Sequence, residues 1–335
     1  MDILSELSNK RRLNRRRFLA GVGAAGAATA LAGCSGPAPY TPPASTTPPA
    51  STSYNDVDIL NFALNLEYLE AEFYLRAATG SGLTTADAGT GAGTVVGGAQ
   101  VAGLNTAQQN ILNEIAYDEQ AHVRFLRSAL STSAVARPNL DLTNSFNVLA
   151  SAAGIGSTFN PFADFNHFLV GAFIFEDVGV TAYSGAAPLI SVAGIAAGYL
   201  TAAAGILAVE AYHAAYVRTT LTAQATALGT TAYPYLNYAN QVSTLRASLG
   251  GGNETMLTVP TGTVPFTATT IATPSSIVAA TSANAIAYAR TTDQVLHIVY
   301  GTFSNTAGST TPAAGVTKGG FFPNGLNGNI TVTQS

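Results

Sequence analysis

The stretch Tyr117-Asp118-Glu119-Gln120-Ala121-His122 is the most informative for the fold, because its Glu-x-x-His spacing returns at Glu210-Ala211-Tyr212-His213. Residues three apart on a helix share one face, so each pair presents a carboxylate and an imidazole together. Nine glutamates and four histidines placed at random in this chain would give about 0.1 such pairs. Two pairs therefore indicate a ligand arrangement better than a single short motif does.

A lone glutamate precedes each pair within an apolar helical pattern. Glu67 lies in NFALNLEYLEAEFY, and Glu176 lies in FLVGAFIFEDVGVTAY. The order Glu, Glu-x-x-His, Glu, Glu-x-x-His is the ligand set with which a four-helix bundle holds two metal ions in its core. The alternative for each is a glutamate on a solvated helix face. The predicted metal ligands are Glu67, Glu119, His122, Glu176, Glu210 and His213.

The two halves repeat beyond these ligands. Tyr74 follows Glu67 by seven residues, and Tyr183 follows Glu176 by seven. Seven residues are nearly two helical turns, so each tyrosine returns to the face of its glutamate. We expect Tyr74 and Tyr183 to bond ligand carboxylates, or else to be core aromatics with other partners. A doubled two-helix unit explains the repeat.

Other acidic residues lie close to the predicted ligands. Glu70 shares a face with Glu67 and is expected to be an extra ligand, a hydrogen-bond partner or a surface residue. Glu72 is expected to be solvated. Asp118 is predicted to orient an imidazole of the other half, although its counterpart in the second repeat is Val209.

The remaining histidines, His167 and His297, have no ligand spacing and are predicted to be structural.

Carboxylates with imidazoles favour iron or manganese among the common metals. Two divalent ions would neutralise four glutamates, which otherwise repel one another in a bundle core. The predicted cofactor is therefore a pair of Fe or Mn ions, and metal should stabilise the fold. No catalytic residue is predicted outside the metal site.

Composition excludes one class of partner. The chain has a net charge of -4, and only 10% of its residues are charged while 47% are hydrophobic. Without residues 1–33 the charge is about -8, because that segment contains six of the 14 basic residues and only two of the 18 acidic ones. Such a chain lacks the positive surface that nucleic-acid binding requires.

The amino terminus has the features of a targeting segment. Arg15-Arg16-Arg17-Phe18-Leu19 resembles a twin-arginine export signal, and Leu31-Ala32-Gly33-Cys34 resembles a bacterial lipobox with lipid added to Cys34. The alternative is an ordinary cleaved signal in which Cys34 has no role. Residues 34–54 are a Pro/Ser/Thr-rich linker. We expect export and a lipid anchor in the bacterial cell envelope.

The helical pattern divides the rest of the chain into a bundle at 55–249 and an extension at 250–335. The run 186–209 carries no charge and is long enough to span a bilayer, but it leads directly into Glu210 and is predicted to be a buried bundle helix. Residues 80–103 and 131–159 are predicted to have little regular structure. The expected helices begin at Asn55 or Asp56, at Asn105 or Thr106, at Asn160-Pro161 and after Val192, followed by 237–249 and 283–300.

Residues 55–249 resemble a ferritin-like domain of the desiccation-related protein family of plants and bacteria. NFALNLEYLEAEFY, YDEQAHVRFLR, FEDVGVTAY and ILAVEAYHAAYVR carry the resemblance, and RTTDQVLHIVYG with GGFFPNGLNGNI resembles the bacterial branch. The resemblance implies an all-α, ferritin-like four-helix bundle with a mixed helix and irregular carboxyl-terminal extension. The resemblance implies a metal site but no settled reaction. Asp118-Glu119-Gln120-Ala121-His122 resembles the Asp-Glu-x-x-His motif of di-iron bundles, whereas the second copy has Val209 in place of the aspartate.

Two functions compete. The first is a dinuclear Fe or Mn site that oxidises Fe(II) or consumes peroxide or dioxygen in stress protection. The second is a structural stress protein in which metal only stabilises the fold. A storage cage is less favoured, because the linker and the extension would crowd a closed shell. A homo-oligomer remains open.

Overall fold

The computed structural model describes residues 54–259, 285–301 and 315–332. The predicted export signal at Arg15 and Arg16, the predicted lipid site at Cys34 and nearly all of the linker lie outside these residues.

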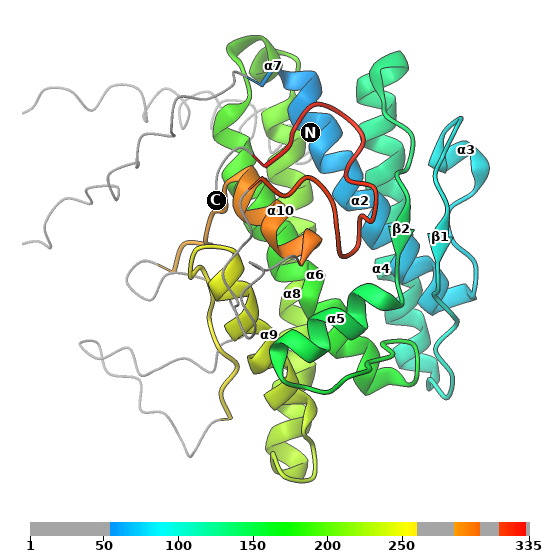
Figure 1. The fold of residues 1–335 in the computed structure, drawn as a ribbon, viewed down its shortest axis with the longest axis vertical. Coiled ribbons are helices and arrows are strands. Elements are labelled where there is room, and N and C mark those ends of the chain that lie inside the picture. Colours follow the sequence, from blue (N-terminus) through cyan, green and yellow to red (C-terminus); the bar gives the residue numbers. More distant parts are fainter. Residues whose placement is uncertain (1–53, 260–284, 302–314, 333–335) are drawn as a thin grey trace, which may run out of the picture. The chain divides into compact units, whose positions relative to one another are not determined.

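Four long helices form the bundle (Figure 1). The first two helices begin with capping boxes. The side chains of Asn55 and Asn105 accept hydrogen bonds from the backbone amides of Asp58 and Gln108, and their own backbone amides donate to the side chains of those residues. The four helices are α2 (Asp56–Thr79), α4 (Thr106–Leu130), α6 (Phe165–Ala186) and α8 (Tyr199–Leu228).

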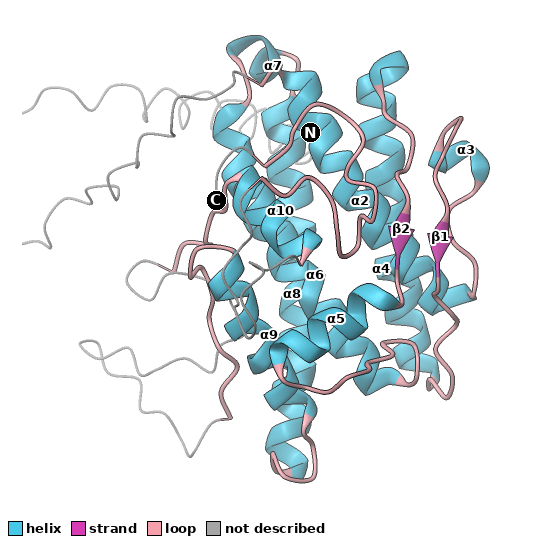
Figure 2. Cartoon of the chain, in the orientation of Figure 1, coloured by secondary structure: helices cyan, strands magenta, loops and turns pink. Residues whose placement is uncertain are grey.

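The helices pack as two pairs. The most extensive contacts join α2 to α4 and α6 to α8, and the pairs meet through α2 and α6. Most residues of α2 and α6 are buried, 19 of 24 and 16 of 22, because these helices lie at the centre of the core. Figure 2 shows helices throughout, with β1 (Val95–Val96) and β2 (Leu140–Asp141) as a short parallel pair. The prediction of an all-α four-helix bundle is confirmed.

The two connections predicted to be irregular contain short elements, so that prediction was wrong in part. Residues 80–103 include α3 (Thr85–Ala88) and β1, and residues 131–159 include a 3₁₀ turn (Ser131–Ser133), β2 and α5 (Asn144–Ala153). The apolar face of α5 packs against α9 and the core through Phe146 and Leu149. Its ten residues were too short to stand out by periodicity alone.

The third bundle helix begins later than Asn160-Pro161 predicts. Pro161 lies in a preceding turn, and α6 begins at Phe165. Asp164 is the cap, because its side chain accepts hydrogen bonds from the backbone amides of Asn166 and His167.

The uncharged run before Glu210 folds as a 3₁₀ turn (Ala187–Leu189), α7 (Val192–Ala196) and the first turns of α8. Most of its residues are half-buried or exposed, so the prediction of one buried bundle helix over 186–209 was wrong. Two helices, within Phe165–Leu189 and Tyr199–Leu228, are long and apolar enough to cross a membrane by length and composition. The most apolar window of the first is 89% buried within the protein and that of the second is 28% buried. The burial of the first helix is that of a core helix of the bundle. For the second helix, length and composition alone are weak evidence of a membrane span.

The carboxyl-terminal helices differ in part from prediction. Helix α9 (Tyr235–Leu249) begins two residues early, whereas α10 (Thr292–Tyr300) is much shorter than the expected helix at 283–300. Thr291 explains the later start, because it forms a capping box with Gln294.

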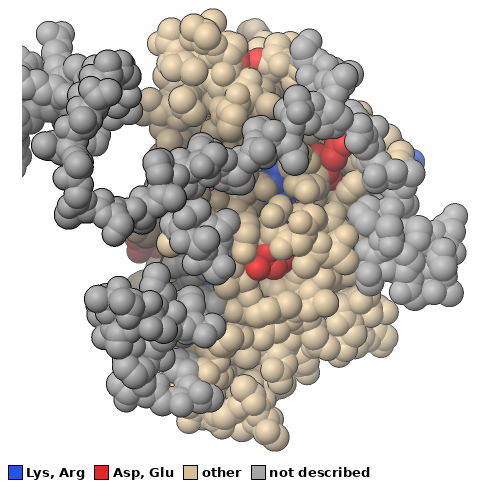
Figure 3. All heavy atoms as spheres, turned by 90° about the vertical axis from the view of Figure 1, so that its left-hand side faces the viewer, with Lys and Arg blue, Asp and Glu red and all other residues tan. Residues whose placement is uncertain are grey.

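The extension contacts the bundle through polar and aromatic side chains. Asn65 on α2 exchanges two hydrogen bonds with the backbone of Asn327, at 2.7 and 3.0 Å. Phe321 packs edge-on against Phe146 and Phe175. The face in Figure 3 carries few charged side chains among uncharged ones, in keeping with the composition.

Candidate metal centre

The six predicted ligands converge inside the bundle. Each helix contributes the residues that its sequence pattern assigned to it, and all six are buried. Glu119 is completely enclosed, and Glu67, Glu176 and Glu210 are each 1% exposed. The spacing of three within each Glu-x-x-His pair aims both side chains at the interior, as helical geometry requires.

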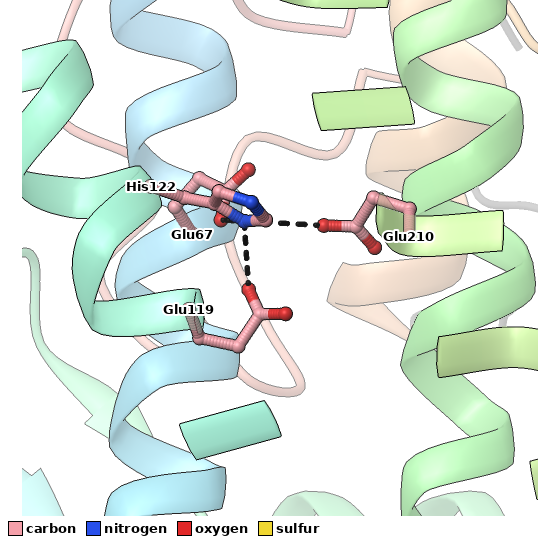
Figure 4. Close-up of side chains that lie close together, drawn as sticks. All are labelled: Glu67, Glu119, His122 and Glu210. Carbon is pink, nitrogen blue, oxygen red and sulfur yellow. Dashed lines mark hydrogen bonds and ion pairs between the residues drawn. The ribbon is translucent and has the colours of Figure 1, made fainter. Parts of the chain in front are cut away.

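The first group of ligand atoms surrounds the ring of His122 (Figure 4). Its Nδ1 lies 3.2 Å from Glu67 Oε2, 3.4 Å from Glu119 Oε2 and 3.8 Å from Glu210 Oε1. Glu210 reaches this ring from the opposite helix pair. One ligand atom from each of the four residues lies within 4.8 Å of the others, which is close enough for a single ion to bind them all.

The second group is formed by Glu119, Glu176 and His213. His213 Nδ1 lies 2.9 Å from Glu119 Oε1 and 3.6 Å from Glu176 Oε2. Glu119 thus takes part in both groups through different oxygens. A carboxylate that faces two cation positions in this way is suited to bridge them.

The two tyrosines of the repeat bond the carboxylates of opposite pairs. The Tyr74 hydroxyl on α2 donates to Glu176 Oε1 on α6, and the Tyr183 hydroxyl on α6 donates to Glu67 Oε1 on α2. Each hydroxyl fixes one oxygen and leaves the other directed into the centre. The predicted placement beside ligand carboxylates is therefore observed, although each tyrosine serves the other half of the repeat.

Asp118 lies beside the imidazole of the other half, as predicted. Its Oδ2 is 3.2 Å from His213 Nε2, while His213 Nδ1 faces the ligand group. An acceptor on one ring nitrogen selects the tautomer whose other nitrogen can bind a metal.

The remaining acidic residues of α2 near the centre are both buried. Glu70 meets Glu176 and Glu210 in a third group of neighbouring carboxylates. The prediction that Glu72 is solvated was wrong, because it is fully buried and paired with Arg76 and Arg137. Arg137 lies 65 positions along the chain, so helical periodicity gave no sign of the pair.

The other two histidines lie outside the ligand groups. His167 contacts Asp164 at 2.8 Å at the start of α6, and His297 is buried in α10. Both positions are compatible with the predicted structural role.

The histidines attract protons in the absence of metal. Burial by itself lowers the pKa of an imidazole, but Glu67 and Glu119 raise the pKa of His122 to about 11. Glu176 and Glu119 likewise raise the pKa of His213 to about 9, against the effect of burial. The metal-free centre therefore keeps its charge low by holding protons.

The carboxylates of the centre differ in the direction of their pKa shifts. Burial would raise the pKa of Glu119, but its contacts with both histidines lower it to about 2. Burial raises the pKa of Glu176 to about 8. Burial and repulsion from neighbouring carboxylates raise the pKa values of Glu70 and Glu210 well above the usual value. Repulsion of this kind is what bound cations relieve.

Unpartnered polar atoms show that the residues fit a metal. Buried polar groups are normally hydrogen-bonded, so several orphans at one place require an explanation. Within the described residues, the buried atoms of this centre without a hydrogen bond are Glu70 Oε2, both oxygens of Glu119, Glu176 Oε2, Glu210 Oε2 and His213 Nδ1. Glu119 lies within ion-pair distance of His122 and His213, but these contacts do not have hydrogen-bond geometry. Each is a lone-pair donor suited to Fe or Mn.

A buried ionic network beside the centre was not predicted. Asp177 follows Glu176 and binds Arg218 at 2.7 Å and Arg246 at 2.9 Å. Glu254 binds Arg246 and Arg290, each at 2.7 Å. The sequence repeat contained one signal of this network, because Arg218 follows Glu210 by eight residues as Arg127 follows Glu119. In the first half Arg127 donates to Tyr68, the residue after Glu67.

Comparison with known proteins agrees with this architecture. A family model described as a ferritin-like domain matches residues 55–223. The chain is 30% identical to ferritin-like catalase Nec2 of Nesocodon mauritianus, over 82% of this chain and 84% of that protein. It is 36% identical to desiccation-related protein PCC13-62 of Craterostigma plantagineum, over 58% of this chain and 63% of that protein. The chain belongs to the ferritin-like, desiccation-related family.

Proposed function

We propose that this protein binds two Fe or Mn ions and consumes hydrogen peroxide by disproportionation. The observation that carries the proposal is the convergence of four glutamates and two histidines from four helices, with unpartnered atoms directed inward. The similarity to a protein named ferritin-like catalase supports the choice of peroxide over other oxidants. Two peroxide molecules give two waters and one dioxygen, so the reaction needs no external reductant.

The metal pair would supply the two-electron chemistry, and the protein would supply geometry and a dry core. Glu67, Glu119, His122 and Glu210 would hold one ion, and Glu119, Glu176 and His213 the other. Tyr74 and Tyr183 keep the terminal carboxylates in place by hydrogen bonds. Access to the centre is narrow, since the side chains of His122 and His213 are 10% and 6% exposed. Such an enclosure admits a small molecule like peroxide better than a larger substrate.

Oxygen evolution tests this function directly. The full-length protein, loaded with Mn(II) or Fe(II) and freed of unbound ions, should release dioxygen from peroxide. Glu119→Ala with His122→Ala should abolish both metal binding and turnover. Glu114→Ala is the matched control, because Glu114 is exposed on the same helix. A loaded protein no faster than free metal would refute the catalase proposal.

The second candidate is a non-catalytic desiccation protein in which metal stabilises the bundle. The deep burial of the centre and the similarity to a desiccation-related protein favour it. This candidate predicts a large metal-dependent rise in Tm without oxygen evolution or Fe(II) oxidation. The same loaded samples distinguish the two functions.

Export and anchoring belong to the same proposal. The resemblance of Arg15 and Arg16 to a twin-arginine signal, and of Cys34 to a lipobox cysteine, supports a lipid-anchored envelope protein. Cys34→Ala should release the protein from membranes or stall its processing without unfolding it. Arg15→Lys with Arg16→Lys should block export. Acyl labelling with fractionation measures both, and a wild-type protein without lipid would rule out the anchor.

A further inference from the structure

Four exposed apolar side chains lie at the end of the bundle where α2 begins. Large apolar side chains that are exposed singly are common, whereas a group of them marks an interaction surface. Helix α7 and the turn before it present Leu189, Val192 and Ile195, and the first turn of α2 presents Val57 (Figure 1). Val192 is 85% exposed, more than any other large apolar residue among those described. We call these four residues the apolar tip.

Contacts between α7 and α2 hold the two parts of the apolar tip together. Asp56 Oδ1 accepts a hydrogen bond from the backbone amide of Ser191 at 2.8 Å, and Asp56 Oδ2 accepts one from the Ser191 hydroxyl at 2.6 Å. Gly194 packs so closely on this carboxylate that an added Cβ would lie 2.6 Å from Asp56 Oδ2. Asp56 directly precedes Val57 and Ser191 directly precedes Val192, so these bonds fix both apolar side chains at one end of the bundle.

The chain around α7 is uncharged. Residues 178–209, which contain every member of the apolar tip except Val57, have no charged residue. This segment therefore has no electrostatic attraction for an acidic partner or for anionic lipid headgroups. Exposed apolar side chains without charge fit the apolar boundary beneath the headgroups of a bilayer.

The chain leaves the bundle beside the apolar tip. Tyr54 is the first described residue and lies two positions before Asp56. Cys34, the proposed site of lipid addition, lies 20 positions before Tyr54. A chain of that length reaches at most about 70 Å, so a lipid on Cys34 would tether this end of the bundle to the membrane. A tether of this kind gives a weak second contact an effective concentration of about millimolar.

We propose that the apolar tip inserts into the headgroup region of the membrane that holds the lipid anchor. The bundle then stands with α7 and the start of α2 towards the bilayer. The proposal rests on the anchor at Cys34 proposed above, and it requires no helix that crosses the membrane. Four apolar side chains bind a bilayer weakly by themselves, and the anchor makes their contact effective.

A single tryptophan reports this contact, because the chain contains none. Val192→Trp places the reporter in the apolar tip. Val148→Trp is the matched control, because Val148 is 48% exposed on α5, which lies away from α7 (Figure 1). Each full-length, lipid-carrying variant is bound to phosphatidylcholine vesicles with brominated acyl chains. The emission of Val192→Trp should shift to shorter wavelength and be quenched, at low and at high salt alike, whereas that of Val148→Trp should not change.

Affinity for vesicles measures the apolar tip without the anchor. Cys34→Ala keeps the full chain but removes the proposed lipid site. In that background Val192→Ser should weaken vesicle binding about tenfold, because one apolar side chain no longer leaves water. Val148→Ser should leave binding unchanged. Circular dichroism checks that each variant is folded.

The outcomes separate the apolar tip from the anchor. Anchored protein in which Val192→Trp is quenched no more than Val148→Trp would overturn the proposal and leave the anchor standing. If the wild type carries no lipid, the anchor fails, and the same comparison in the Cys34→Ala background at high vesicle concentration decides the apolar tip. Selective quenching there would support the tip alone, and its absence would overturn both.

A second copy of the chain is the alternative occupant of the apolar tip. In that case the emission of Val192→Trp would shift to shorter wavelength without vesicles, and the shift would grow with protein concentration. This result would assign the apolar tip to self-association and overturn the membrane contact.

Discussion

Single residues around the ligands decide how rigidly the centre is held. Each terminal glutamate has one oxygen fixed by a tyrosine from the other half, and His213 has Asp118 on its outer nitrogen. Such partners orient ligands that would otherwise rotate, so they affect metal affinity without touching the metal.

Removal of the Tyr183 hydroxyl should loosen the first metal position. Tyr183→Phe keeps the ring but frees Glu67 from its tyrosine partner, and metal affinity should fall about 10- to 100-fold. Tyr117→Phe is the control, because Tyr117 is exposed on α4. Calorimetry measures both, and equal affinities would show that the hydroxyl does not position the carboxylate.

The stability of the metal-free protein should fall as pH rises from 6 to 9. The folded pKa values of Glu176 and His213, about 8 and about 9, lie above the ordinary values of 4.5 and 6.5. Between the ordinary and raised values the folded state binds more protons than the unfolded state, so rising pH favours unfolding. Each linked proton contributes about 1.4 kcal/mol per pH unit.

Metal should reverse this trend, because binding requires deprotonated ligands and becomes tighter as pH rises. Denaturation at pH 6, 7, 8 and 9, with chelator and with Mn(II), measures both trends. A metal-free protein whose stability rises over this range would contradict the placement of these protons.

Among the helices, close backbone approach decides where the extension attaches to the bundle. A Cβ at Gly185 near the end of α6 would lie 1.8 Å from the carbonyl oxygen of Arg290, just before α10. The atoms that such a Cβ would meet belong to the backbone of Arg290, which cannot shift as easily as the end of a side chain. Only glycine permits this contact between the third bundle helix and the extension.

Gly185→Ala should therefore destabilise the protein by about 1–3 kcal/mol. Gly205→Ala is the matched control, because nothing lies within 4 Å of a Cβ added at Gly205 in α8. Alanine favours a helix over glycine, so the control should gain up to about 1 kcal/mol. Urea denaturation distinguishes the two, and a loss of stability in both variants would contradict this account.

Across the molecule as a whole, a buried ionic network joins the bundle to the extension. Asp177 on α6 binds arginines of α8 and α9, and Glu254 and Arg290 continue the network beyond the bundle. The three arginines are among the largest fully buried side chains of the described residues. Breaking such a network leaves uncompensated charge in the interior.

Asp177→Ala should cost about 3–5 kcal/mol, because Arg218 and Arg246 would lose their shared carboxylate. Arg124→Ala should cost less than about 1 kcal/mol, since its pair with Asp87 is solvated on the arginine side. The free energy of unfolding in urea is the measurement. Similar losses in both variants would mean that burial does not set the strength of these pairs.

Local spacing in the sequence was enough to predict the bundle and the six candidate ligands. The informative signals are the glutamate and histidine three apart in each Glu-x-x-His pair and the tyrosines seven residues after Glu67 and Glu176. The starts of the first two helices were also predicted, at Asn55 or Asp56 and at Asn105 or Thr106, and the structure shows Asn55 and Asn105 as the caps. Helical geometry converts such spacing directly into a shared face, so no distant contact is needed to predict it.

Contacts between distant residues set the fates of Glu70 and Glu72, which the sequence left open or misassigned. Glu72 is buried because Arg137 reaches it from beyond the next helix, and Glu70 lies in the centre beside Glu176 and Glu210 of two other helices. Periodicity shows which way a side chain points along its own helix. Partners that are distant in the sequence decide whether a charge there is solvated, paired or left for a metal.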